Sequence, residues 1–157
     1  MKIKLNHLLF ALLSIASFFV FISCSNEPEP INYGEDHCSY CEMKIMDKKF
    51  GSELVSKKGK VFKFDSVECL AAFVNEGENV KSDNISSLWV TDYLNPENFL
   101  LAENSIYYVG KNIKSPMGLY ISAFQTEKNL LSVTSTDEGK ILNWSSIKEY
   151  VKQEWEQ

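Results

Sequence analysis

The chain has 157 residues, of which 45% are hydrophobic and 24% charged, and its formal net charge at pH 7 is −5. A chain of this length can form one domain with a substantial hydrophobic core. It contains no arginine and fewer basic than acidic residues, which argues against binding to nucleic acids or to anionic lipid headgroups, because both need a basic surface.

Residues 1–23 have the pattern of a bacterial export signal. Two lysines precede an apolar run over residues 8–22, which is too short for a comfortable membrane span and is followed by a small residue. Cys24 comes directly after an Ile-Ser pair and resembles the cysteine of a lipobox, which becomes a lipidated N-terminus after cleavage. We therefore expect residues 1–23 to be a lipoprotein signal peptide and Cys24 to carry the lipid. A cleaved secretory signal and an uncleaved N-terminal anchor are the alternatives.

Cleavage before Cys24 would leave 134 of the 157 residues, with 14 lysines, 21 acidic residues and a net charge of −7. Residues 24–36 are polar and contain two prolines and one glycine, so we expect them to form an extended tether. The folded domain would then comprise residues 37–157. Membrane attachment would depend on the lipid alone, and the protein would lie in the cell envelope, facing the periplasm or the exterior.

Residues 37–46, with the sequence HCSYCEMKIM, are rich in side chains that bind soft metal ions. Seven cysteine, methionine and histidine residues follow Cys24: His37, Cys38, Cys41, Met43 and Met46 within this run, and Cys69 and Met117 beyond it. Three thiols remain once Cys24 carries a lipid. An odd number of thiols outside the cytoplasm means that one thiol stays free, pairs between chains or binds a ligand.

Four interpretations of the Cys38-x-x-Cys41 pair remain open from the sequence. The pair, or one of its members with Cys69, is suited to a structural disulfide, and a thioredoxin-like redox pair has the same spacing. A structural zinc site needs four ligands, of which the cysteines supply three. Cu(I) prefers thiolate and thioether ligands. Met43, two positions after Cys41, suits copper and adds nothing for zinc, so we favour Cu(I).

The middle of the chain predicts a hairpin followed by a helix. Residues 51–64 contain two β-type runs separated by a turn with a glycine. The helix is expected to begin at Asp65, which forms a capping-box pattern with Glu68, and to end at Gly77. Cys69 would lie near the first turn of this helix, where the positive helix end favours a thiolate.

A weak internal repeat suggests how the rest of the chain folds. Residues 59–68 align with residues 139–148 at a shift of 80, with three identical positions. We therefore expect an α+β fold of two ββα halves, residues 37–77 and 115–155. The second half would contain strands at 119–124 and 130–134 and a last helix capped by Ser146, and strands at 88–93 and 106–109 would join the halves.

The repeat also gives Met117 a role. Met117 precedes the strands of the second half as Met43 and Met46 precede those of the first, so the two segments would face each other across one cleft. Pro116 and Gly118 place Met117 in a turn, where its thioether would point outward. We therefore predict that Met117 is a metal ligand from the second half.

Several short motifs resemble those of the NosL family, the copper-binding accessory lipoproteins of the nitrous oxide reductase system. They are Cys38-x-x-Cys41-x-Met43, Phe64-Asp-Ser, Asp92-Tyr, Ala102, Tyr108-Val-Gly and Ser115-Pro-Met117-Gly118. The resemblance implies a two-half ββα fold and Cu(I) binding outside the cytoplasm. It also implies copper delivery towards the reductase, with copper-delivering or copper-accepting proteins of that system as partners.

The chain departs from the family pattern in two places. Glu42 stands where the family usually has a glycine between the second cysteine and the methionine. Leu119 and Tyr120 stand where some members have a histidine. We expect His37 or a third sulfur to take the place of that missing histidine.

No motif in the sequence indicates catalysis. The chain lacks a glycine-rich phosphate loop and a His-Glu-x-x-His motif, and only one histidine follows Cys24. We therefore expect a membrane-tethered Cu(I) chaperone that is not an enzyme. The alternatives are an extracytoplasmic thiol–disulfide enzyme and an interaction domain held together by zinc or a disulfide. Tyr40 and Phe50, which lie near the cysteines in the sequence, are candidates for shielding a metal from water.

Overall fold

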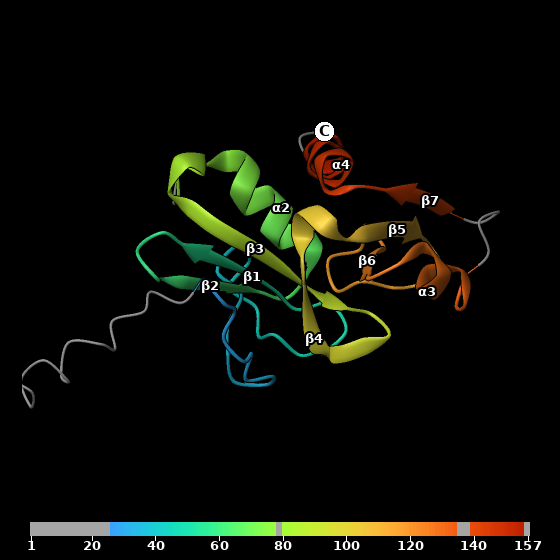
Figure 1. Cartoon of the computed structure of the whole chain (residues 1–157), viewed down its shortest axis with the longest axis horizontal. Coiled ribbons are helices and arrows are strands. Elements are labelled where there is room, and N and C mark those ends of the chain that lie inside the picture. The colour runs from blue at the N-terminus through green and yellow to red at the C-terminus, as the bar shows by residue number, and fades with distance from the viewer. Residues whose placement is uncertain (1–25, 78–79, 135–138, 156–157) are drawn as a thin grey trace, which may run out of the picture.

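A computed structural model describes residues 26–77, 80–134 and 139–155, which form two antiparallel sheets with helices packed on them (Figure 1). The first sheet has the order β2-β1-β3-β4 and consists of β1 (Ser52–Ser56), β2 (Val61–Phe64), β3 (Ile85–Asp92) and β4 (Asn95–Leu101). The second has the order β6-β5-β7 and consists of β5 (Ile106–Gly110), β6 (Ile121–Phe124) and β7 (Gly139–Leu142). The helices are α2 (Val67–Glu76), α3 (Glu127–Leu131) and α4 (Trp144–Trp155), with 3-10 turns η2 (Ser82–Asn84) and η3 (Ala102–Asn104). The expected α+β class is confirmed.

Side chains of β2 alternate between two packing partners. Phe62 and Phe64 point towards α2 and pack on Phe73, with ring centroids 5.2 and 5.1 Å from it. Lys63 points to the other face, where its ammonium group forms an ion pair with Asp36 at 2.8 Å. The helix and the N-terminal segment therefore cover opposite faces of the first sheet.

Residues 26–36, which the sequence predicts to be part of an extended tether, lie against the first sheet. Ile31 is buried, and the backbone oxygen of Asn26 accepts hydrogen bonds from two side chains of β3, at 2.7 and 3.3 Å. The folded part therefore begins near Asn26, because one apolar side chain and several hydrogen bonds hold a segment whose composition is typical of a linker. The predicted signal peptide and Cys24 lie outside the described residues, and Ser25 alone separates Cys24 from Asn26 in the sequence.

The N-cap of α2 is Ser66. Its backbone is extended (φ −158°), and its Oγ accepts a hydrogen bond from the Cys69 N–H at 3.4 Å. The predicted cap at Asp65 is wrong, because the Ser66 hydroxyl satisfies the helix end and leaves the Asp65 carboxylate available for other contacts. Gly77 ends the helix as expected, with φ 63° in the left-handed region.

The second half of the chain differs from the prediction in its strands. Residues 130–134 do not form a strand, because Thr126 caps a short helix there: its Oγ1 accepts from the Asn129 N–H at 3.1 Å. β6 and β7 both pair with β5 and not with each other. β4, which no pattern in the sequence predicts, extends the first sheet.

The predicted repeat of two ββα halves is not confirmed. In the first predicted half, β1 and β2 form a hairpin, whereas β6 and β7 lie on opposite sides of β5. The same strand order recurs elsewhere: residues 52–92 and 106–142 both follow the order ββαβ, with the first strand between the other two. Equivalent strands of these two units are not 80 residues apart in the sequence. The alignment at a shift of 80 therefore pairs strands that are not equivalent in the fold.

Helix α4 packs against α2 and β5 and joins the two sheets (Figure 1). Trp144 and Ile147 are buried, and the Trp144 ring lies 6.0 Å from that of Tyr107. The helix begins at Trp144, before the predicted cap at Ser146, because Asn143 Oδ1 accepts from the Ser146 N–H at 2.9 Å. No helix within the described residues is long and apolar enough to cross a membrane.

The buried carboxyl group of Glu53 predicts a pH dependence of stability. Its Oε2 accepts from the Glu29 N–H at 2.8 Å, its Oε1 has no hydrogen-bond partner among the described residues, and burial raises its pKa from 4.5 to about 7. Because folding raises this pKa, the stability that the protonated group contributes is fully present below about pH 4.5 and is lost as the pH rises through about 7.

We expect the free energy of unfolding of the parent, measured by urea titration relative to that of Glu53→Gln, to fall between about pH 5 and pH 8. The amide of Glu53→Gln stays neutral and its oxygen still accepts from Glu29, and the comparison removes the pH dependence of the other titrating groups. The exposed Glu97→Gln is the control and should leave the fall unchanged. An equal fall in Glu53→Gln and the parent would show that another group causes the pH dependence.

Candidate metal centre

Three thiols and one carboxylate converge at the start of α2. The Sγ atoms of Cys38, Cys41 and Cys69 and a carboxylate oxygen of Asp65 all lie within 4.8 Å of one another. Cys38, Cys69 and Asp65 are buried, and Cys41 is half-buried. All three cysteines are free thiols in the structure. A buried group of this composition is suited to holding a soft or borderline metal ion.

A tight turn brings Cys38 and Cys41 together. The Cys38 N–H donates to Met43 O at 2.8 Å, and the Glu42 N–H donates to Cys38 O at 3.0 Å. Glu42 has φ 63°, in the left-handed region that favours glycine. Glu42, which departs from the family pattern, therefore has a side chain at a position where the backbone conformation favours glycine. The side chain is exposed, so only the backbone is strained.

β2 connects this turn to the other two members of the cluster. The Ser39 N–H donates to the backbone oxygen of Lys63 at 2.7 Å, which fixes the turn to the strand. Asp65 directly follows β2, and Cys69 lies in the first turn of α2. The cysteines that are distant in sequence therefore meet because the turn is attached to the strand that leads into the helix.

Hydrogen bonds give the three thiols different acidities. The Cys69 thiol donates to Cys38, and together with nearby backbone N–H groups this lowers the Cys38 pKa to about 6 against the opposing effect of burial. The same hydrogen bond, together with burial, raises the pKa of Cys69. Burial is the largest cause that raises the Cys41 pKa to about 11, and the Cys41 thiol lies 3.7 Å from Asp65 Oδ2, to which it donates.

The metal-free cluster is therefore a chain of hydrogen bonds with one thiolate. Cys38 carries the negative charge near neutral pH, while Cys41 and Cys69 keep their protons and donate them to neighbouring acceptors. A metal ion that binds more than one sulfur must displace these protons, so binding becomes weaker as the pH falls.

Tyr40 lies at the cluster as proposed from the sequence, whereas Phe50 does not. The Tyr40 ring stacks on Trp155 of α4, with centroids 5.9 Å apart, and its hydroxyl donates to Glu76 Oε1 at 2.7 Å. Tyr40 packs on the same core as the three cysteines. Phe50 belongs to a second hydrophobic core formed around Tyr108.

The remaining predicted ligands have different positions. His37 is exposed, its backbone forms an isolated bridge with Lys44, and it is not part of the cluster. Met43 and Met46 lie on the same loop as the cysteines, with 49% and 68% of their surface exposed. Met117 is half-buried and packs on the core that contains Cys38 and Cys69.

Asp65 is the member of the cluster that no motif in the sequence identifies as a ligand. Aspartate and serine are both favoured N-cap residues, and the capping-box pattern assigned Asp65 to the helix end. Ser66, the next residue, is also a favoured N-cap residue. Its presence indicates that the Asp65 side chain is not needed at the helix end and can contact other groups. One of its oxygens, Oδ1, is buried without a hydrogen-bond partner among the described residues.

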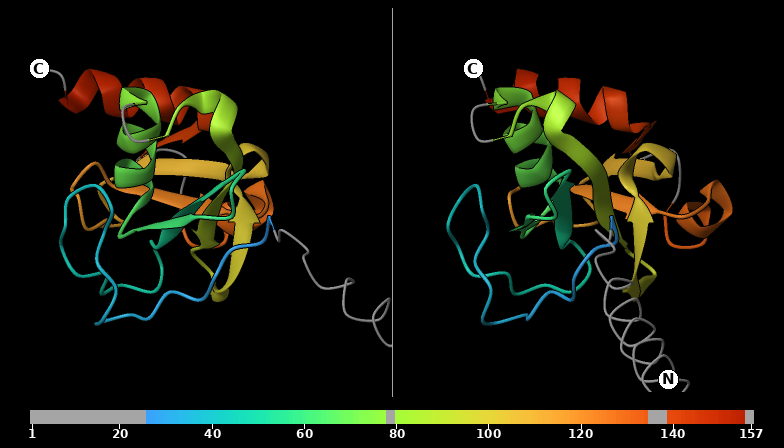
Figure 2. Two further views of the ribbon diagram at one scale, coloured as in Figure 1. Left: turned by 90° about the vertical axis from the view of Figure 1, so that its left-hand side faces the viewer. Right: turned by 60° about the vertical axis from the view of Figure 1, so that its left-hand side comes forward.

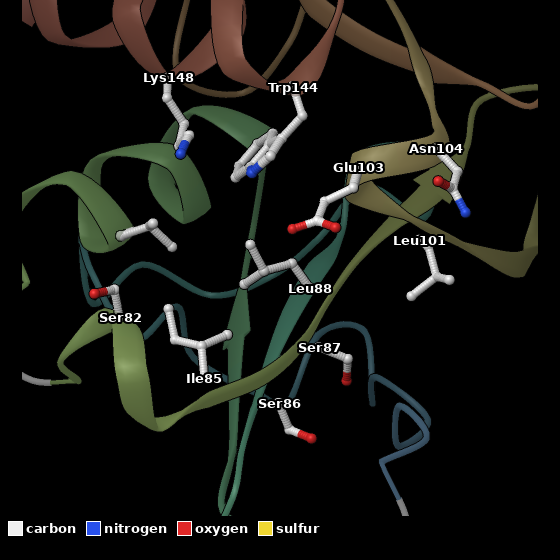
Figure 3. A pocket seen from close by; sticks show the side chains of 11 residues that line it. Ser82, Ile85, Ser86, Ser87, Leu88, Leu101, Glu103, Asn104, Trp144 and Lys148 are labelled. Carbon is white, nitrogen blue, oxygen red and sulfur yellow. The ribbon is translucent and has the colours of Figure 1, made fainter.

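A cleft of about 460 Å³ lies apart from the cluster, between α2, β3, η3 and α4. Lys148 and Trp144 project into it from α4, and Glu103 projects from η3 towards Leu88 (Figure 3). None of the four cluster residues lines this cleft. The candidate metal centre and the cleft are therefore separate features.

Comparisons with known proteins agree with the fold. The sequence model of the NosL family matches residues 31–151. A search of curated proteins gave no match. The crystal structure of the copper chaperone NosL from Shewanella denitrificans superposes with a TM-score of 0.64, covering 77% of this chain and 95% of that one at 23% sequence identity. At this identity the likeness establishes a common fold.

The hydrogen bond between Cys69 and Cys38 predicts the ionisation of the metal-free protein. In the reduced protein, ultraviolet absorbance should show one thiolate forming near pH 6. Cys69→Ala removes the largest cause of the low pKa and should move this step towards the ordinary value of 9. Cys41→Ala should move it less. A step that stays near pH 6 in Cys69→Ala would contradict this assignment.

Proposed function

Since the chain belongs to the NosL family, we propose that it is an extracytoplasmic Cu(I) chaperone, tethered to a membrane by lipid and without catalytic activity. The observation that carries the proposal is the convergence of three free thiols within 4.8 Å. Thiolates are preferred ligands of Cu(I). The solved protein with the same fold is described as a copper chaperone, which supports the same cargo here.

The proposed ligands combine charged and neutral sulfur atoms. Cys38, Cys41 and Cys69 supply thiolates, but three thiolates beside Asp65 leave an excess of negative charge around one monovalent ion in a buried place. A thioether adds a sulfur ligand without adding charge. Met117 packs on the same core as Cys38 and Cys69, which supports it as the neutral ligand from the second half of the chain.

The exposed methionines suit copper transfer more than storage. Met43 and Met46 lie on the loop of Cys38 and Cys41, and about half or more of each side chain is accessible to solvent. We assign them as transient Cu(I) ligands at the surface, because an exposed thioether can bind the ion weakly and release it. The partners would be copper-delivering or copper-accepting proteins of the nitrous oxide reductase system, as the family resemblance implies.

Zinc is the second candidate, because Asp65 adds a fourth ligand to the three cysteines. Structural zinc sites are usually closed and tetrahedral, with cysteine, histidine or carboxylate ligands. The four side chains within 4.8 Å meet this requirement in number and type. A zinc-stabilised interaction domain would need all four, and it would have no use for Met117.

The position of Asn26 supports a defined orientation at the membrane. Ser25 alone separates this residue from the predicted lipid on Cys24, and hydrogen bonds hold Asn26 on β3. Figure 2 (left) shows the described chain beginning on one side of the molecule and the loop of residues 36–50 lying on the other. A lipidated protein would therefore lie close to the membrane, with the metal centre directed away from it.

Selectivity and the role of Met117 are tested by one titration. The reduced protein without its signal peptide is titrated anaerobically with Cu(I) or Zn(II), with native mass spectrometry as the readout. We expect Met117→Leu to weaken Cu(I) binding by about tenfold or more and to leave Zn(II) binding unchanged. The metal-free variant should lose less than about 1.5 kcal/mol of stability, because the substitution nearly conserves volume.

Leu142→Ile is the matched control, because Leu142 packs on the same core as Met117 and is not a proposed ligand. Its equilibrium affinity for Cu(I) should equal that of the parent. Two outcomes would contradict the proposal. A Met117→Leu protein that binds Cu(I) like the parent would remove Met117 from the ligand set. A protein that binds zinc tightly and ignores Cu(I) would favour the zinc-stabilised domain.

Localisation is tested with Cys24→Ser in the full chain. We expect the parent to appear in the membrane fraction with incorporated lipid, because a lipoprotein anchor carries more than the single chain that binds only marginally. The variant should lose the lipid and the membrane association but keep its affinity for Cu(I). Lipid incorporation that persists in Cys24→Ser would show that the anchor is elsewhere.

A further inference from the structure

We propose that Glu68 and Ser115 are positioning residues, which fix the loop of residues 115–120 to α2 and thereby hold the Met117 thioether at the metal centre. This inference rests on the proposed function, in which Met117 is a Cu(I) ligand. It concerns two residues that contact no metal themselves.

The first observation is a hydrogen-bond chain between the helix and the loop. Glu68 is the residue before Cys69, lies in the first turn of α2 and is fully buried. Its Oε1 accepts a hydrogen bond from Ser115 Oγ. The same hydroxyl oxygen accepts from the Tyr120 N–H at 2.8 Å. One serine side chain therefore connects the first and last residues of the loop to the helix that carries Cys69.

The second observation is the backbone conformation of the loop. Gly118 has φ 83° and Tyr120 has φ 61°, so two residues adopt the left-handed region. For a residue other than glycine this conformation has an energetic cost. The bond from Tyr120 N–H to Ser115 Oγ offsets this cost. Without the hydroxyl we expect the loop to relax and Met117, which lies between the two bonded residues, to move.

The third observation is the burial of the Glu68 carboxyl group. This burial is unfavourable, and a residue that only packs in the core would not need a carboxyl group. A carboxyl group taken out of water needs hydrogen bonds, and Glu68 Oε2 has none among the described residues. An apolar side chain of similar size would pack at this place without that cost. The arrangement gains the Ser115 bond, which fixes a loop 47 residues away in sequence beside Cys69.

Positioning makes a prediction that simple stabilisation does not. If Ser115 acts through Met117, its removal should weaken binding of Cu(I), which uses the thioether, and spare binding of Zn(II), which uses Cys38, Cys41, Cys69 and Asp65. Removing Ser115 should also have no effect once Met117 is gone. A stabilising role alone would lower both metal affinities or neither.

The test is a double-mutant cycle on the reduced protein without its signal peptide, with Cu(I) and Zn(II) affinities measured by competition with chelators. We expect Ser115→Ala to weaken Cu(I) binding about tenfold and to cause no further loss in the Met117→Leu background. Zn(II) affinity should not change. Ser115→Thr, which keeps a hydroxyl, should retain the affinity of the parent.

Variants at Glu68 and a control complete the experiment. Glu68→Gln should bind Cu(I) like the parent, because its amide oxygen still accepts from Ser115, whereas Glu68→Leu, which adds no sulfur ligand, should resemble Ser115→Ala. Ser122→Ala is the matched control, since Ser122 is a buried serine whose Oγ has no hydrogen-bond partner among the described residues. It should leave Cu(I) affinity unchanged.

The outcomes separate this inference from the function on which it rests. Parent-like Cu(I) affinity in Ser115→Ala and Glu68→Leu, together with weakened affinity in Met117→Leu, would overturn the positioning role and leave the chaperone proposal intact. Additive losses in the double variant, or equal losses for Cu(I) and Zn(II), would also overturn it. Parent-like affinity in Met117→Leu would remove the ligand and with it the reason for positioning.

Discussion

The metal centre depends on β2, a strand of four residues at the edge of the first sheet. The outer edge of this strand binds the Cys38–Cys41 turn through the bond from Ser39 N–H to Lys63 O. Its C-terminal end leads directly to Asp65 and then to Cys69 in α2. Because both halves of the cluster are attached to the same short strand, their separation is fixed by its geometry. The turn also covers an edge that would otherwise be open to pairing with another chain.

The two faces of β2 make this arrangement rigid. Phe62 and Phe64 pack on Phe73 and so hold α2 to the strand. On the other face, the Lys63 ammonium group binds Asp36 and the backbone oxygen of Pro30. One face of β2 therefore holds the residues just before Cys38, and the opposite face holds the helix that carries Cys69. Packing and hydrogen bonding thus preorganise the cluster before any ion arrives.

Protons occupy the cluster when the metal does not. Cys69 donates to Cys38 and Cys41 donates to Asp65, so the buried polar atoms largely satisfy one another. Binding of copper would displace the protons of Cys41 and Cys69. The positive charge of the ion would then offset the repulsion between the neighbouring thiolates. A chaperone must release its cargo. When the ion leaves, Cys41 and Cys69 can be protonated again and re-form their hydrogen bonds, which stabilises the protein without copper. The low pKa of Cys38 leaves one thiolate ready as the first ligand.

The sequence was sufficient for the local elements around the metal centre and insufficient where distant contacts decide the structure. The hairpin, the helix ending at Gly77 and the strands near residues 88–93 and 106–109 follow from alternation and capping signals, and the structure contains them. The capping-box pattern of Asp65 and Glu68 predicts a cap at Asp65, but the neighbouring Ser66 takes that role in the structure. The strand expected at 130–134 is apolar and β-branched, but the Thr126 cap favours a helix.

Composition is a poor guide to the structure of residues 26–36. Proline, glycine and acidic residues are typical of linkers, yet Asn26 and Ile31 bind residues 26–36 to the sheet. The alignment of residues 59–68 with 139–148 matched β2 with β7, which have different partners. Strand pairing involves residues far apart in the chain, so three identities did not determine it.

We propose that sulfur atoms alone bind one Cu(I) ion at the start of α2. X-ray absorption spectroscopy of the copper-loaded, reduced protein tests it directly, because the fine structure distinguishes sulfur from nitrogen and oxygen neighbours. We expect a monovalent ion with sulfur neighbours only, and one fewer sulfur neighbour in Met117→Leu. A first coordination shell with nitrogen or oxygen, from His37 or Asp65, would contradict it.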